Sequence, residues 1–116
     1  MASELIDLRD RLRIFAAERD WDQFHSPKNL AAALSVEAAE LLEHFQWLKE
    51  EQSVDLAPAK RAAVGEEIAD VLLYLIRIAD KLDIDVLDAA LKKIEANAKK
   101  YPVEKARGKM TKYRDL

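Results

Sequence analysis

The sequence contains no cysteine, and only 2 glycines and 3 prolines occur among its 116 residues. Without cysteine the chain can form neither a disulfide framework nor a thiolate metal site, and it has no thiol nucleophile. Hard oxygen atoms therefore become the favoured ligands for any metal. Because glycine and proline are scarce, little material is available for hairpin turns, and this favours an all-α fold.

The chain also lacks an excess of positive charge and a long apolar run. Its 22 acidic residues outnumber its 19 basic ones, which gives a formal net charge of −3 and disfavours nucleic acid as a partner. No apolar run approaches the roughly 20 residues that a membrane span needs. Residues 1–10 carry charges throughout and lack the apolar core of a signal peptide. We expect neither a nucleic acid nor a membrane as partner, and a cytosolic location.

What is present is a set of helical patterns separated by short polar stretches. A chain of this length favours a single domain over residues 1–116. Ser26 followed by Pro27 is a good N-cap and first-turn pair, and Asp83 or Asp85 can cap a later helix. We predict a four-helix, bundle-like fold with helices over about residues 4–19, 27–49, 58–82 and 84–100, the last stopped by Pro102. The remaining residues, 100–116, are predicted to form an extended basic C-terminal arm.

The third predicted helix is apolar almost all the way round. Such a helix is buried on most sides, and one short chain can seldom surround it. We therefore expect that another copy of the protein covers part of this apolar surface, so that the protein is a homo-oligomer. The residues concerned are Ile68, Val71, Leu72, Leu73, Leu75, Ile76, Ile78 and Ala79.

Two of the predicted helices each contain a pair of acidic residues three positions apart, which we call an acidic doublet. The doublets are Glu37 with Glu40 and Glu67 with Asp70. Positions three apart lie on one helix face, so each doublet can aim both carboxylates at one point. Each helix also places an acid at the margin of its apolar stripe, where an unpaired carboxylate would resist desolvation. A bound divalent cation would offset the cost of burying these carboxylates. Mg²⁺ binds oxygen ligands, and substrate phosphates commonly complete its coordination shell.

Solvated surface acids are the alternative to a metal site. Spacing alone favours solvated surface acids, because acids three residues apart are common on helices. The placement of an acid at the apolar margin of both helices makes a metal site and surface acids about equally good explanations. A di-iron bundle would need a Glu-x-x-His pair from each of two helices. Neither histidine fits, because His25 lies in a predicted loop and His44 follows Glu40 by four.

Other residues suit the binding of a nucleotide. Lys93, Asn97 and Lys100 form one stripe of donors able to face a triphosphate, although a solvated lysine face is the simpler explanation for Lys100. Trp21 and Trp47 flank the helix with the first doublet, so we predict that they form pocket walls. Aromatic residues at helix ends are more often core residues, and this is the prediction for Phe24. His25 is interpreted as a loop contact rather than a catalyst.

The pattern Glu37-x-x-Glu40 followed by Glu67-x-x-Asp70 resembles that of the MazG-type all-α nucleoside triphosphate pyrophosphohydrolases. The similarity covers nearly the whole chain and is greatest to the dCTP pyrophosphatase branch. It extends over Arg19 to His25, Pro27, Asn29, Phe45-Gln46-Trp47, Glu67 to Tyr74, Asn97, Tyr101-Pro102-Val103 and Lys112 to Leu116.

The resemblance implies a helical homodimer or dimer of dimers that uses Mg²⁺ to hydrolyse a deoxynucleoside triphosphate to the monophosphate and pyrophosphate. It implies four metal ligands that are also the catalytic residues: Glu37, Glu40, Glu67 and Asp70. It also implies substrate contacts from Trp21, Trp47, Tyr74, Lys93, Asn97 and Tyr101. One departure is Leu12, where the resemblance leads us to expect a histidine, and this leaves base selectivity open among dCTP and modified pyrimidine dNTPs.

Two other functions compete with the hydrolase. A non-catalytic homo-oligomeric scaffold would explain the amphipathic helices equally well, but it gives no reason for acids at the apolar margins. A nucleotide-binding regulator would bind the same ligands without turnover. In the hydrolase interpretation, Glu40 is the candidate for taking a proton from the attacking water.

Overall fold

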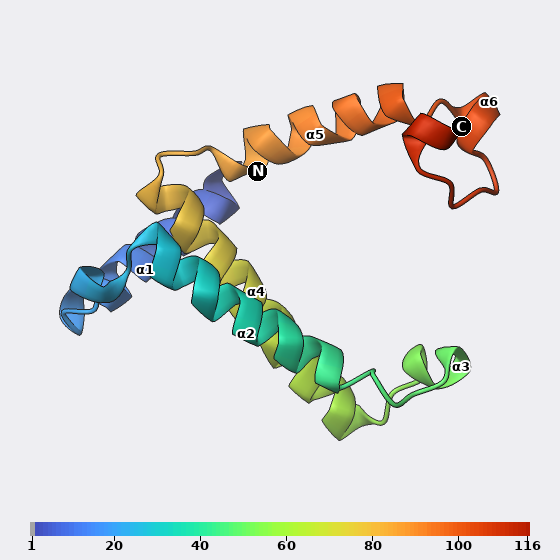
Figure 1. Ribbon diagram of the computed structural model, residues 1–116. Coiled ribbons are helices and arrows are strands. Elements are labelled where there is room, and N and C mark those ends of the chain that lie inside the picture. The colour runs from blue at the N-terminus through green and yellow to red at the C-terminus, as the bar shows by residue number, and fades with distance from the viewer. Residues whose placement is uncertain (1) are drawn as a thin grey trace. The chain divides into compact units, whose positions relative to one another are not determined.

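The computed structural model describes residues 2–116, and this part of the chain contains helices and no strand. The all-α class predicted from the sequence is confirmed. The chain divides into two compact units, Met1–Ile84 and Asp85–Leu116. The elements, labelled in Figure 1, are α1 (Ala2–Glu18), η1 (Asp22–Phe24), α2 (Pro27–Glu43), α3 (Glu50–Ser53), α4 (Pro58–Lys81), α5 (Val86–Lys100), α6 (Val103–Ala106) and η2 (Tyr113–Asp115).

The first unit is built on the packing of α2 along α4. The two helices run in opposite directions side by side, and α1 packs against α4 as well (Figure 1). Apolar residues from α1, α2 and α4 form the core, which therefore lies where these three helices meet. The most buried of them are Ala16, Leu30, Val64, Ile76 and Ala79.

The start of α2 follows the predicted capping signal. Ser26 has an extended backbone, and its Oγ accepts a hydrogen bond of 3.1 Å from the backbone N–H of Asn29. Pro27 occupies the first turn, where its missing N–H costs nothing. The Asn29 side chain donates to the carbonyl of Phe24 at 3.0 Å, so the loop that contains η1 is tied to the first turn of α2.

The predicted end of α2 near residue 49 is wrong, because the helix ends at Glu43. The chain then turns with short-range bonds, such as that from the N–H of Leu48 to the carbonyl of Phe45 at 2.9 Å. At Lys49 the backbone is extended, and its N–H donates to the side chain of Gln52 at 2.8 Å. This local capping begins α3, so a new helix forms where a polar linker was predicted.

Helix α4 begins at Pro58 as predicted and ends within one residue of the predicted position. Asp83 then takes a left-handed backbone conformation with φ of 54°. The N–H of Ile84 reaches back to the carbonyl of Ala79 at 2.8 Å, and that of Asp83 bonds Asp80 at 3.2 Å. These two bonds form a Schellman ending, which satisfies the last carbonyls of the helix.

The second unit begins with the Asp85 cap of α5, whose side chain accepts from the N–H of Asp88 at 3.0 Å. The helix reaches Lys100 as predicted. The basic tail contains α6 and η2, two short helical segments where an extended arm was predicted. In this tail the Tyr113 ring packs edge-on against Tyr101 at 6.1 Å, with the Lys100 ammonium 4.9 Å from its centre.

None of the helices in residues 2–116 combines the length and apolar character that a membrane span requires. The single domain, the bundle-like assembly of the four long helices, the oligomer and the cytosolic location stay predictions.

Candidate functional site

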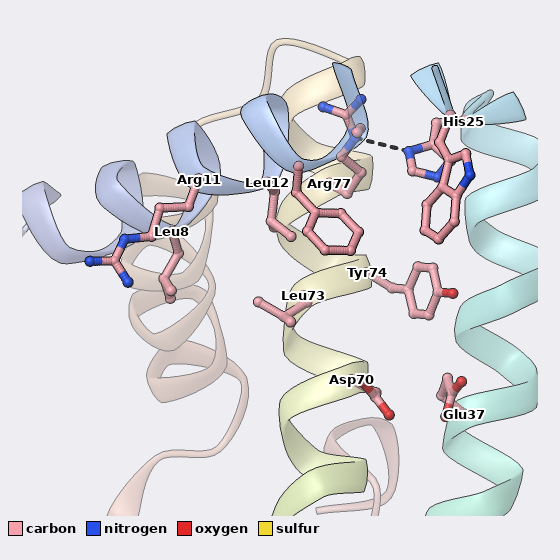
Figure 2. Close-up of a pocket in the computed structure, with 12 residues that line it drawn as sticks. Leu8, Arg11, Leu12, His25, Glu37, Asp70, Leu73, Tyr74 and Arg77 are labelled. Carbon is pink, nitrogen blue, oxygen red and sulfur yellow. Dashed lines mark hydrogen bonds between the residues drawn. The ribbon is translucent and has the colours of Figure 1, made fainter. Parts of the chain in front are cut away.

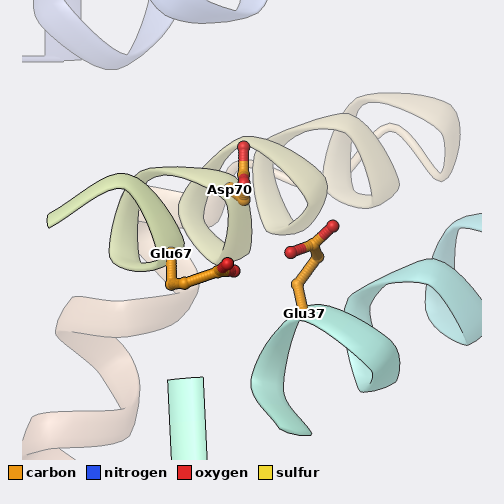
Figure 3. A group of neighbouring side chains, drawn as sticks. All are labelled: Glu37, Glu67 and Asp70. Atoms are coloured by element: carbon orange, nitrogen blue, oxygen red, sulfur yellow. The ribbon is translucent and has the colours of Figure 1, made fainter. Parts of the chain in front are cut away.

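Three carboxylates converge between α2 and α4. Glu37 extends from α2 toward α4, which contributes Glu67 and Asp70 (Figure 3). One oxygen from each residue lies within 4.8 Å of the others. The packing of α2 along α4 thus brings Glu37 close to two acids that follow it by thirty residues or more in the sequence. Glu40, the fourth predicted ligand, is not part of this group.

Two oxygens of this carboxylate group are buried without a hydrogen-bond donor. Across the described residues, neither Oε2 of Glu37 nor Oε2 of Glu67 has a hydrogen-bonding partner. An unsatisfied buried oxygen is costly, and two adjacent carboxylates also repel each other. A divalent cation would satisfy both oxygens and neutralise the repulsion, so the residues present fit a hard cation such as Mg²⁺.

The electrostatics of the acids agree with this crowding. The pKa of Glu37 is raised from its ordinary value, first because its carboxyl group can share a proton with Glu67 and then because of burial. The pKa of Glu40 is also raised, and its interaction with Glu37 is the main cause. Each raised pKa means that the neighbourhood disfavours the ionised form. A bound cation would reverse that preference.

A cavity of about 420 Å³ adjoins the carboxylates. Figure 2 shows Glu37 and Asp70 facing each other across the gap between α2 and α4, with Tyr74 further along and the Arg77–His25 pair beyond it. The lining is otherwise mostly apolar and aromatic, so the cavity combines one anionic end with walls suited to a flat ring. The lining residues are Leu8, Arg11, Leu12, Phe15, Ala16, Trp21, His25, Glu37, Asp70, Leu73, Tyr74 and Arg77.

The aromatic wall is held by ring contacts. Phe15 and Trp21 pack edge to face with their centres 5.6 Å apart, and Trp21 meets His25 at 6.5 Å. Trp21 follows the left-handed residue Asp20, whose φ of 54° ends α1 and turns the chain toward η1. The turn at the end of α1 therefore places the indole on the cavity wall.

Known proteins match this chain over most of its length. The model of the MazG-like family matches residues 32–116. The chain belongs to the MazG-like family. It is 46% identical over 114 residues to dCTP pyrophosphatase 1 of Bos taurus, covering 97% of this chain and 68% of that protein. The human dCTP pyrophosphatase 1 is 43% identical, with coverage of 97% and 67%.

A solved relative of this MazG-like chain has the same fold. The crystal structure of a pyrophosphatase from Archaeoglobus fulgidus superposes with a TM-score of 0.80 at 42% identity. The match covers 85% of this chain and 93% of that one. The fold is therefore shared along most of both chains.

The structure places the predicted substrate-binding residues in different parts of the MazG-like chain. Trp21 and Tyr74 line the cavity. Trp47 is not among the lining residues, and its side chain is 87% exposed because α2 ends before it. The other three, Lys93, Asn97 and Tyr101, belong to the second unit.

The structure tests the roles predicted for Phe24 and His25. The predicted core position of Phe24 is wrong for this chain, because the ring is 59% exposed at the end of the short η1 turn. His25 does make a contact that fixes the loop, as interpreted, since its Nδ1 accepts a hydrogen bond from Arg77. It also lines the cavity, which the sequence did not indicate.

Sequence reasoning missed Arg77, which lines the cavity with only 6% of its surface exposed. Its signal was an arginine directly between Ile76 and Ile78 in an apolar run. Such a residue needs a partner, because an unpaired buried charge is costly. Phe15 follows Leu8 and Leu12 at helical spacing, and nothing in the sequence separates a core role from a place on the cavity wall.

Proposed function

We propose that this MazG-like protein is a Mg²⁺-dependent nucleoside triphosphate pyrophosphohydrolase. Its substrate is a deoxynucleoside triphosphate, dCTP or a modified pyrimidine dNTP. In the reaction, water adds to a phosphorus atom and the anhydride bond between the α- and β-phosphates breaks, which releases the monophosphate and pyrophosphate. The observation that carries the proposal is the convergence of Glu37, Glu67 and Asp70 at one end of a cavity with aromatic walls. The dCTP pyrophosphatase relatives support the substrate class.

In this proposal the three converging acids would hold Mg²⁺. The bound ion would supply positive charge for the phosphate oxygens and acidify a water molecule. Glu40 lies close enough to Glu37 for the interaction between the two carboxyl groups to raise the pKa of Glu40. We assign to its carboxylate the removal of a proton from the attacking water, because it is outside the converging group.

The base would bind between the aromatic residues of the cavity. Trp21 and Tyr74 offer ring faces, and stacking a nucleobase on such a ring gains on the order of 1–3 kcal/mol. Leu12 also lines the cavity, so its apolar side chain limits which hydrogen-bonding groups can read the base. Trp47 is kept as a proposed base contact, and Lys93, Asn97 and Tyr101 as proposed contacts to sugar and phosphates.

We also propose that the protein is a homodimer or a dimer of dimers. Along α4, Ile68, Leu72 and Leu75 are 54%, 41% and 43% exposed, and they follow a spacing of four and three residues. This spacing places them in one apolar stripe on the helix. An apolar stripe of this kind is costly in water, and a second copy would cover it.

The proposed reaction is tested by identifying its products. Incubation of dCTP and the other common dNTPs with Mg²⁺ should yield the monophosphate and pyrophosphate, separable by anion-exchange chromatography. Formation of the diphosphate and inorganic phosphate would contradict the proposal. If no product forms with any dNTP while Mg²⁺ and a non-hydrolysable dNTP still raise the melting temperature, the protein is a nucleotide-binding regulator instead.

A further inference from the structure

Arg77 is a buried cation on the cavity wall. The polar groups that it contacts are not those of the converging acids Glu37, Glu67 and Asp70. Its Nε donates to Nδ1 of His25 at 3.2 Å, and its Nη2 donates to Asp22. Its Nη1 lies 3.6 Å from Asp80 on the same helix. Figure 2 shows the dashed bond between Arg77 and His25 at the end of the cavity opposite Asp70 and Glu37. The guanidinium thus connects α4 to the η1 loop.

The bond from Arg77 decides where His25 carries its proton. A guanidinium has only donors, so the Nδ1 atom that it meets must be an unprotonated acceptor. The neutral imidazole then has its hydrogen on Nε2, for which residues 4–116 supply no hydrogen-bond partner. Because His25 lines the cavity, Nε2–H is the ring donor available to a ligand there.

The charges around His25 favour its neutral form. Its pKa is lowered, first by burial and then by the nearby cations Arg77 and Lys81, while Asp22 acts in the opposite direction. A protonated imidazole would have to give up the acceptor at Nδ1 and place a second cation beside Arg77. The neutral form therefore persists at pH 7.

We propose that Arg77 is a positioning residue of the nucleotide site, which fixes the His25 ring and its tautomer so that one Nε2–H donor is presented to an acceptor atom of the nucleotide. The inference rests on the proposed function for the identity of the ligand, but the tautomer follows from the geometry alone. Asp22 accepts one hydrogen bond from the Arg77 guanidinium and a separate one from Lys81 at 2.5 Å. Lys81 does not line the cavity, which makes it the matched control.

The tautomer is tested by long-range ¹H–¹⁵N NMR on the His44→Gln protein, in which His25 is the remaining one of the 2 histidines. We expect the pattern of the Nε2–H tautomer at pH 7. Replacement of Arg77 by methionine should give a mixture of tautomers and raise the pKa of His25. The Nδ1–H pattern in the His44→Gln protein, or an unchanged pattern without Arg77, would overturn the proposal.

The same spectra identify the acceptor. Deoxycytidine provides the base and sugar without phosphates, whereas inorganic pyrophosphate provides phosphate oxygens without the base. A shift of the His25 Nε2 signal with deoxycytidine assigns the acceptor to the nucleoside, and a shift with pyrophosphate plus Mg²⁺ assigns it to the phosphates. If neither probe nor dCTP shifts the signal, the role of His25 as a donor is wrong.

Kinetics separate this positioning role from folding. Arg77→Lys keeps the charge but loses the planar Nε–H donor. We expect it to raise the KM for dCTP about tenfold and to leave kcat within about twofold, since a uniformly used binding contact affects KM. Lys81→Met should leave both parameters near wild type. Equal effects of the two changes would show that Arg77 acts only through the loop, and a wild-type protein inactive on every dNTP would instead refute the proposed function.

Discussion

The residues that fit a metal are poorly satisfied without one. Glu37 and Glu67 each bury an oxygen that no donor in the described chain reaches, and they lie beside a third carboxylate from Asp70. The arrangement is costly in the metal-free protein, because like charges must share a small volume. A fold that keeps this arrangement has a site shaped for its ligand at the expense of its own stability.

This cost predicts how stability depends on pH. In the folded protein the pKa values of Glu37 and Glu40 lie above their ordinary value of 4.5, so the native state binds protons more tightly than the unfolded chain. Their contribution is therefore fully present below about pH 4.5 and is lost as pH rises through the folded pKa. In EDTA, Glu37→Gln should melt at a higher temperature than wild type at pH 7.5, and this difference should shrink at pH 5.

The comparison with Glu37→Gln removes the effect of other groups that titrate. The pKa values of Asp22 and Asp80 are lowered by hydrogen bonds to Lys81 and Arg13, so these two contribute stability that is lost on acidification. They are present in both proteins and cancel in the difference. Addition of Mg²⁺ at pH 7.5 should stabilise wild type more than the variant. A difference in melting temperature that is the same at both pH values would contradict the assignment of strain to these acids.

At the scale of single elements, local signals predicted some helix boundaries and missed others. Ser26 and Asp85 both act as side-chain caps where the sequence indicated, because a cap depends on atoms three residues away. The end of α2 was missed because the apolar spacing of Phe45 and Leu48 continues past Glu43. The start of α3 was missed because its N-cap residue, Lys49, is not one of the residue types that mark a helix start.

The end of α4 offers a test of backbone strain. Asp83 takes a φ of 54° at the helix end, a conformation that costs a residue with a Cβ atom about 1–2 kcal/mol. Glycine avoids that cost but loses about 0.5–1 kcal/mol through its freedom in the unfolded chain. Asp83→Gly should therefore raise the free energy of unfolding, by up to about 1.5 kcal/mol.

Chemical denaturation of Asp83→Gly beside wild type measures this effect. Asp83→Ala is the matched control, because it removes the same carboxylate but keeps the Cβ atom. The alanine variant should be no more stable than wild type. A glycine variant that is less stable than the alanine variant would mean that the left-handed conformation is not the source of strain.

At the scale of the whole molecule, the cavity was harder to predict than the fold. Its walls come from α1, the η1 loop, α2 and α4, and residues as far apart as Leu8 and Arg77 line it. Periodicity identifies which face of a helix is apolar, but it does not say which apolar residues border empty space. The acidic residues were accessible to prediction because a charge at an apolar margin is unusual, whereas Leu8 and Phe15 look like ordinary core residues.

The apolar stripe on α4 predicts the assembly. Leu72→Glu would place a charge among Ile68 and Leu75, so we expect it to shift the protein toward the monomer in sedimentation velocity experiments. Val54→Glu is the matched control, because Val54 is 86% exposed and lies outside the stripe. A wild-type monomer, or an unchanged assembly in Leu72→Glu, would refute the proposed interface.

The central claim is that Glu37, Glu67 and Asp70 form a metal site for hydrolysis. The most direct measurement is the rate of pyrophosphate release from dCTP with Mg²⁺ for wild type, Glu67→Gln and the neighbouring control Glu66→Gln. Glu67 reaches the convergent group, whereas Glu66 is exposed and outside it. The metal site predicts that Glu67→Gln lowers kcat by about 100-fold or more and that Glu66→Gln stays within about twofold of wild type. Equal rates for the two variants would contradict it.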